Sequence, residues 1–169
     1  MSRNEVEFVV DPESPVITTR RVVNAPRALT WDCFTKVEHL RRWKSPKGCD
    51  VLVMECDVRP GGAWRVVYKG PQGEFGFHGE YREVAPLERY VRTFLRNGTS
   101  DEIVETLVLT DAGAGKTLIT AKNVYPSMAA REGLLQQGGH LGAQKGYEAL
   151  DDLLESLGAG GGAAQATMR

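Results

Sequence analysis

The stretch FGFHGEYR, residues 75–82, decides the fold class. Its aromatic side chains Phe75, Phe77 and Tyr81 fall at alternate positions, and His78 lies between them in the opposite phase. A period of two is typical of a strand with one buried face. The preceding residues 70–73, GPQG, have the composition of a hairpin turn. We therefore expect a half-buried antiparallel strand whose aromatic residues face inward and whose His78 faces away.

The segments on both sides of this strand show the same short apolar runs, separated by turn-forming residues. The expected strands are Cys49–Cys56, Trp64–Lys69, Phe75–Arg82, Leu87–Arg96, Asp101–Thr110 and Lys116–Tyr125. Gly and Asn residues in the connections, such as Asn97-Gly98, favour tight turns. Six consecutive strands joined in this way predict an antiparallel meander.

Helices are expected before and after the meander. Pro15–Val23 is β-branched and predicts one more strand, after which Asn24 is a candidate N-cap with Pro26 in the first helical turn. The spacing predicts short helices over Arg27–Thr35 and Val37–Trp43, and one long helix from the cap Ser127 to about Leu157. Only that long helix can cover the concave face of the sheet. The fold class is therefore α+β, in two layers.

Composition limits the function. The 169 residues carry 22 acidic and 21 basic side chains, so charge gives no argument for a nucleic acid or a membrane as partner. Three cysteines without CxxC spacing, with no signal peptide and no long apolar run, favour the cytoplasm. We expect an N-terminal extension over 1–13, one domain over 14–157 and a disordered Gly/Ala-rich tail over 158–169.

No sequence motif indicates a catalytic or metal site. Residues 113–117, GAGKT, lack the first glycine of a P-loop and precede a strand, so we interpret them as a hairpin turn. His39, His78 and His140 are scattered without metal-ligand spacing. We expect no metal and no cofactor, assign no catalytic residue and favour a protein that is not an enzyme.

Four segments in a fixed order resemble a known family. They are RRVVNAPR (20–27), EHLRRW (38–43), DVRPGGAW (57–64) and FHGEYREV (77–84). They resemble the AHSA-type proteins, homologues of the activator of the heat-shock-protein-90 ATPase, within the START-like SRPBCC superfamily. The resemblance covers Pro15 to Leu157 and implies a helix-grip fold, a curved sheet around the C-terminal helix with an elongated cavity between them. It implies no shared catalytic residue, because the superfamily includes lipid carriers, polyketide cyclases and co-chaperones.

Aromatic and small residues supply the candidate binding site. Rigid rings often line pockets for small apolar ligands, whereas Trp31 and Phe34 are interpreted as core. The candidate ligand-binding residues are Trp43, Trp64, Phe77, Tyr81, Thr93, Leu135, Gly139 and Gly142. Helix-interior glycine costs roughly 0.5–1 kcal/mol, so glycines on the sheet-facing side of the long helix need a reason. We expect Gly138, Gly139, Gly142 and Gly146 to flank or roof a cavity; the alternative is a kink at Gly138-Gly139.

Three functions are consistent with these observations. The leading hypothesis is a binding protein for a small hydrophobic or aromatic ligand. The second is a stress-related co-chaperone, although residues 1–13 leave no room for an additional N-terminal domain. The third is a cyclase-like enzyme, for which Glu105, Thr93 and Tyr81 would be the polar candidates. Edge strands could also pair across a homodimer, although nothing in the sequence requires it.

Overall fold

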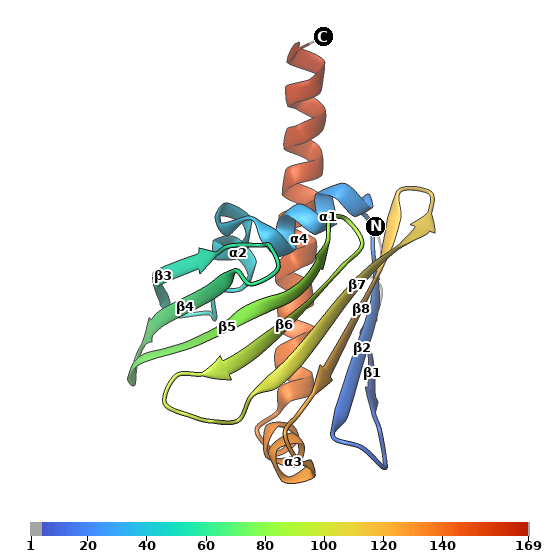
Figure 1. The fold of residues 1–169 in the computed structure, drawn as a ribbon. Helices are drawn as coiled ribbons and strands as arrows, with labels where there is room; N and C mark the ends of the chain where they lie inside the picture. Colours follow the sequence, from blue (N-terminus) through green and yellow to red (C-terminus); the bar gives the residue numbers. More distant parts are fainter. Residues whose placement is uncertain (1–4, 169) are drawn as a thin grey trace.

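The computed structural model describes residues 5–168, except for the side chains of 140, 141 and 159–168 (Figure 1). The strands are β1 (Glu7–Val10), β2 (Val16–Val23), β3 (Asp50–Cys56), β4 (Ala63–Gly70), β5 (Gly73–Ala85), β6 (Arg89–Arg96), β7 (Ile103–Gly113) and β8 (Lys116–Val124). The helices are α1 (Arg27–Thr35), α2 (Val37–Trp43), α3 (Met128–Gln136) and α4 (Gly139–Met168). The expected α1 and α2 are confirmed with the same bounds, and so are all the expected strands, with small shifts at their ends.

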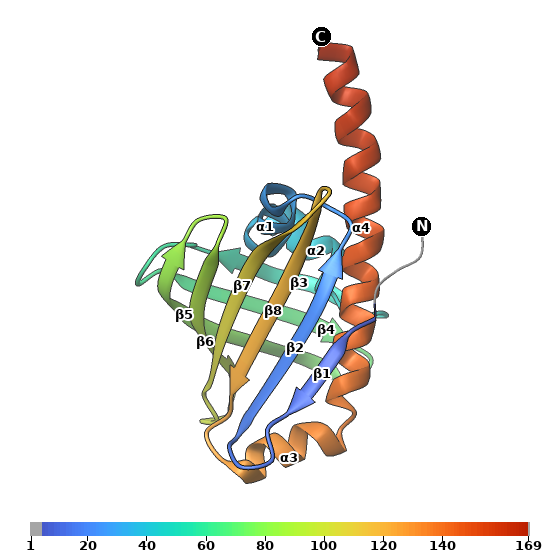
Figure 2. The ribbon, with the colours of Figure 1, turned by 90° about the vertical axis from the view of Figure 1, so that its right-hand side faces the viewer.

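One curved antiparallel sheet contains all eight strands (Figure 2). Their order, β1-β2-β8-β7-β6-β5-β4-β3, confirms the meander from β3 to β8. The β1–β2 hairpin joins the β8 edge, where Val16 pairs with Val124 and Val23 pairs with Thr117. Strand β1 was not expected, because Phe8–Val10 is short and Asp11 follows directly. Part of the segment expected as an N-terminal extension therefore belongs to the sheet.

Helix α4 covers the concave face of the sheet and completes the helix-grip fold (Figure 1). Its apolar stripe is confirmed, because Tyr147, Leu150, Leu153 and Leu154 are buried in the main core and Leu150 is 0% exposed. A buried polar contact also joins α4 to β2: Arg21 donates to the Tyr147 carbonyl at 2.8 Å and forms an ion pair with Asp151. The helix is thus held by both apolar and charged contacts.

The expected single C-terminal helix is in fact two helices. Ser127 caps α3 as expected, since its hydroxyl accepts a hydrogen bond from the Ala130 N–H at 3.0 Å. The chain then turns at Gly138, whose φ of 80° is a left-handed conformation that ends helices and favours glycine. The kink proposed at Gly138-Gly139 is therefore confirmed. Arg131 of α3 donates to the Ser14 carbonyl at 2.6 Å and so fixes the β1–β2 loop to this helix.

One expectation about a helix end is wrong. Pro26, and not Asn24, occupies the N-cap of α1, and no side chain caps this end. The backbone of α4 is helical to Met168. That residues 158–169 form a tail outside the domain remains a prediction. Across residues 5–168, the described helices include none with a long enough apolar stretch to cross a lipid bilayer.

Candidate functional site

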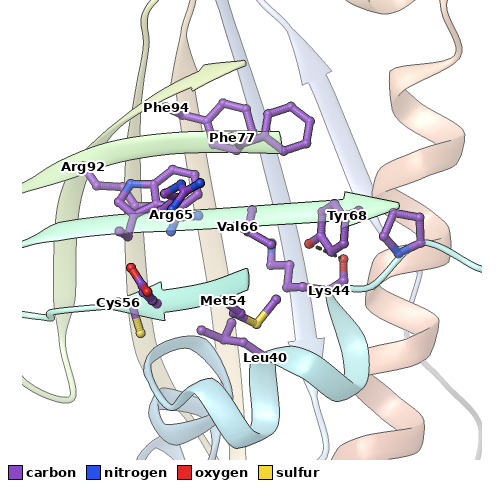
Figure 3. Close-up of a pocket in the computed structure, with 13 residues that line it drawn as sticks. Leu40, Lys44, Met54, Cys56, Arg65, Val66, Tyr68, Phe77, Arg92 and Phe94 are labelled. Atoms are coloured by element: carbon purple, nitrogen blue, oxygen red, sulfur yellow. Dashed lines mark hydrogen bonds between the residues drawn. The ribbon is translucent and has the colours of Figure 1, made fainter. Parts of the chain in front are cut away.

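A pocket of about 220 Å³ lies between α2 and the concave face of strands β3 to β6 (Figure 3). It is lined by residues of α2 and the loop that follows it, and of four adjacent strands. These residues are Leu40, Lys44, Pro46, Met54, Glu55, Cys56, Trp64, Arg65, Val66, Tyr68, Phe77, Arg92 and Phe94. The alternation of β4 explains the placement, because its buried residues Trp64, Val66 and Tyr68 share one face.

An aromatic cluster forms one wall of the pocket. The Phe77 and Phe94 ring centres are 4.8 Å apart, and those of Trp64 and Phe94 are 5.3 Å apart. The Trp64 indole N–H donates to the Thr93 carbonyl at 2.9 Å, which fixes the ring. Gly79 makes this approach possible, since a Cβ there would lie 2.6 Å from the Trp64 Nε1. The sequence thus builds a rigid apolar wall.

Arg92, which lines the pocket, belongs to a buried ion pair. The Arg92 Nε donates to the Glu105 Oε1 at 2.9 Å, and the Tyr90 hydroxyl donates to the same oxygen at 3.3 Å. The Arg92 guanidinium also lies 4.2 Å from the centre of the Trp64 ring. Burial alone would raise the pKa of Glu105, but the Arg92 and Lys44 cations and the hydrogen bonds hold it below its ordinary value. Glu105 is therefore a permanent carboxylate at neutral pH.

Lys44 directs an ammonium group into this lining from the end of α2 (Figure 3). Although the residue keeps solvent-exposed surface, its Nζ lies 4.5 Å from the centre of the Trp43 ring. Desolvation lowers the pKa of Lys44 to about 8, with Glu105 opposing and Arg92 reinforcing the shift. The Tyr68 hydroxyl donates to the Lys44 carbonyl at 2.9 Å and fixes its backbone against the sheet.

The structure brings together only some of the residues expected at the site. Trp64 and Phe77 line the pocket. Tyr81 is fully buried beside it, with its ring centre 5.4 Å from that of Tyr90 and its hydroxyl next to Arg92 without a well-formed hydrogen bond. His78 is exposed, as expected from its phase in the strand.

Two of the expected residues make other contacts. The Trp43 indole N–H donates to the Cys33 carbonyl at 2.7 Å, and its ring packs 5.0 Å from that of Phe34 in the core. The Thr93 hydroxyl accepts a hydrogen bond from the Glu80 N–H at 3.0 Å, within the β5–β6 pairing. Neither residue lines the pocket. That either contacts a ligand remains a prediction.

The helical residues Leu135, Gly139 and Gly142 do not line this pocket either, nor does any other α4 residue whose side chain the structure describes. Gly139 serves the turn between helices, since a Cβ there would lie 2.8 Å from Leu134 Cγ. A Cβ on Gly142 or Gly146 would meet nothing within 4 Å, so these glycines do not mark a close approach to the sheet. The glycines were expected around a cavity under the C-terminal helix. The pocket lies instead under α2 and the loop that follows it.

Sequence reasoning missed Lys44, Arg92 and Phe94. Arg92 had a usable signal, since it shares the inward phase of Tyr90 and Phe94 in β6 and pairs in register with Glu105. Charged residues at two paired inward positions are typical of a buried ion pair. Lys44 follows the last residue of α2, and no local pattern predicts the direction of its side chain.

The described side chains outside this ion pair form neither a metal site nor a nucleophilic thiol site. No three histidine, cysteine or acidic side chains among them come together as a metal site requires, and His140 lies outside the described side chains. Cys56 lines the pocket, but burial raises the pKa of its thiol, which donates to the Thr35 carbonyl at 3.1 Å. Burial raises the pKa of Cys33 to about 12. Neither thiol has the thiolate character of a nucleophile.

Comparison with known proteins identifies the family. A family model described as Activator of Hsp90 ATPase homolog 1-like protein matches residues 24–155. The chain belongs to this family. The resemblance expected from the four sequence segments is therefore confirmed for this AHSA1-like protein, together with the helix-grip fold. No curated protein matches the chain.

Solved structures share the fold of this AHSA1-like protein. A Rhodobacter sphaeroides protein has a TM-score of 0.83 at 23% identity, covering 90% of this chain and 100% of its own. A Mycobacterium smegmatis protein has a TM-score of 0.79 at 22% identity, covering 89% and 97%. A Nitrosomonas europaea protein has a TM-score of 0.76 at 25% identity, covering 89% and 99%. This likeness supports the shared fold. The function is argued from the pocket of this chain.

Proposed function

We propose that this protein binds a small apolar or aromatic molecule in the pocket between α2 and strands β3 to β6. The observation that carries the proposal is the rigid wall formed by Trp64, Phe77 and Phe94 around about 220 Å³ of space. Ligand sites in proteins are mostly apolar and aromatic, with a few placed polar groups. Lys44 and Arg92, whose guanidinium is paired with Glu105, are polar groups of that kind.

The size of the pocket limits the ligand. An apolar cavity of ~150 Å³ holds a benzene molecule, so this pocket accommodates a molecule somewhat larger than a single ring. A bicyclic aromatic compound or a short branched chain fits that range. A whole membrane lipid does not fit within it.

Binding is tested by thermal shift and native mass spectrometry with a panel of bicyclic aromatic compounds. We expect at least one compound to raise the Tm and to form a 1:1 complex. Phe77→Leu removes a wall ring but keeps the site apolar, and we expect it to weaken binding by about tenfold. Leu52→Ala is the matched control, because Leu52 is 45% exposed on β3 and does not line the pocket. The proposal would be contradicted if no compound of the panel bound, or if Phe77→Leu and Leu52→Ala bound the compound with equal affinity.

The family description favours one alternative, activation of an Hsp90 ATPase. Steady-state ATPase measurements with and without the protein test it, and stimulation that is unaffected by Phe77→Leu would support a function independent of the pocket. The cyclase alternative has weaker support. Glu105 is held ionised, and burial raises the pKa of Tyr81 to about 12, so neither group exchanges protons readily near neutral pH.

A further inference from the structure

Lys44 is a cation of the pocket that lies close to an aromatic ring. Among the described side chains, no carboxylate forms an ion pair with Lys44. Its ammonium instead lies over the Trp43 ring, at 4.5 Å from the ring centre. A cation–π contact compensates only part of the hydration that an ammonium loses in an apolar site. Lys44 is thus attracted by the Glu105 carboxylate, which is already paired with Arg92, and forms no ion pair of its own among the described side chains.

The other charged residues around the pocket balance one another in sign. Arg92 is paired with Glu105 at 2.9 Å. Glu55 and Arg65, one acid and one base, stand at opposite positions in the β3–β4 pairing, and both are exposed. Tyr68 and Tyr90 use their hydroxyl groups in hydrogen bonds to Lys44 O and Glu105. One unit of positive charge therefore remains for a ligand to neutralise.

The apolar wall defines the rest of the ligand. Arg92 lies 4.2 Å from the Trp64 ring centre and covers a face of that ring. Phe77 and Phe94 remain as aromatic contacts, and both are only partly buried. A ligand that uses the whole pocket therefore combines an aromatic body with a single negative charge. A dianion such as a phosphate monoester would leave one charge unmatched.

We propose that the ligand is a small aromatic monocarboxylate, whose ring packs on Phe77 and Phe94 and whose carboxylate pairs with the Lys44 ammonium. This inference rests on the proposed function and names the ligand class for the same pocket. Charge-assisted hydrogen bonds between ammonium and carboxylate are among the stronger ones in proteins. Lys44 is accordingly the residue that selects acids over neutral aromatic compounds.

The test uses two ligands of equal size and different charge. Isothermal titration calorimetry at pH 7 compares 2-naphthoic acid with neutral 2-naphthalenemethanol on the full chain. We expect the acid to bind at least about tenfold more tightly than the alcohol. In Lys44→Met we expect the acid to fall to the affinity of the alcohol, with the alcohol unchanged. Lys47→Met is the matched control, because Lys47 is exposed three positions away and does not line the pocket; it should keep the preference.

The outcomes separate this inference from the proposed function. Equal affinities for acid and alcohol in the wild type, or an unchanged preference in Lys44→Met, would overturn the carboxylate assignment while binding itself stands. Absence of binding by both compounds and by the wider panel would overturn the proposed function. Circular dichroism melting establishes that Lys44→Met is folded, and Lys44→Gln repeats the test with a polar neutral side chain. In the wild type, acid affinity should also fall as pH rises through the titration of Lys44, whereas alcohol affinity should not.

Discussion

Arg92 and Glu105 stand directly opposite each other on β6 and β7 and are joined by a 2.9 Å hydrogen bond from Nε to Oε1. Their side chains are only 9% and 17% exposed, so neither charge is well hydrated. The carboxylate therefore depends on the guanidinium, and the guanidinium on the carboxylate. Lys44 contributes a second positive charge to the same environment.

Glu105→Gln should destabilise the protein by about 3–5 kcal/mol, because it leaves the buried Arg92 guanidinium without a counter-charge. Urea unfolding followed by circular dichroism measures the change. The double variant Arg92→Met, Glu105→Leu removes both charges and should be less destabilised than Glu105→Gln. A double variant that loses as much as the sum of both single variants would show that the two residues act independently.

The Arg92–Glu105 pair also predicts a loss of stability in acid. The pKa of Glu105 is lowered from 4.5 in the folded protein, so below pH 4.5 the unfolded chain binds a proton more readily than the folded one. The unfolding free energy should therefore fall as pH falls from 4.5 through the folded-state pKa. Glu105→Gln should show a shallower fall over the same range in urea titrations. Parallel pH profiles for wild type and variant would contradict this assignment.

Lys44→Met should raise the Tm at pH 7 by no more than about 2 °C, because the ammonium that it replaces is only partly desolvated and the residue keeps solvent-exposed surface. The folded-state pKa of Lys44 is about 8 against 10.5 when unperturbed, so the folded protein disfavours the charged form. The cost disappears as pH rises from about 8 to 10.5, and the Tm difference should narrow over that interval. Differential scanning calorimetry at several pH values measures it. A lower Tm for the variant at pH 7 would contradict the partial desolvation of the Lys44 ammonium.

Two glycines of the C-terminal region should respond in opposite ways to alanine. Gly138→Ala should destabilise by about 1–2 kcal/mol, since its φ of 80° is strained for any residue with a Cβ. Gly142→Ala should stabilise by about 0.5–1 kcal/mol, since it is exposed within α4 and a Cβ would meet nothing within 4 Å. Denaturant titration of the two variants gives the comparison. Equal effects would show that neither position is limited by backbone conformation.

The sheet could be predicted from sequence because its determinants are local. Alternation over residues 75–82 and turn residues such as Asn97-Gly98 specify strands and hairpins without knowledge of the remaining chain. Strand β1 was missed, because its four residues are too few to show an alternating pattern. It is a strand because it pairs with β2. The break at Gly138 was weighed as an alternative, because glycine can end a helix or be tolerated within one.

The site was only partly predictable because it depends on how α2 is placed over the sheet. Trp64 and Phe77 were found from strand phase, which determines the face of a sheet on which a residue lies. Lys44 contributes through the direction of a flexible side chain after a helix, and sequence periodicity contains no information on that direction. Gly139 and Gly142 were associated with the pocket from the expectation that α4 would cover it, whereas α2 and its following loop do so.

Strand β2 lies beside β8 in the sheet, so it is synthesised early but can pair with β8 only late. Val23 pairs with Thr117, far along the chain, whereas each meander strand pairs with its immediate successor through a short turn. Contacts between distant segments form late, because closing a long loop costs more chain entropy than closing a short one. Strands β1 and β2 therefore leave the ribosome before β8 but reach their final place in the sheet only after β8 has been made. Until then β2 presents an unpaired edge, and unpaired edges favour aggregation.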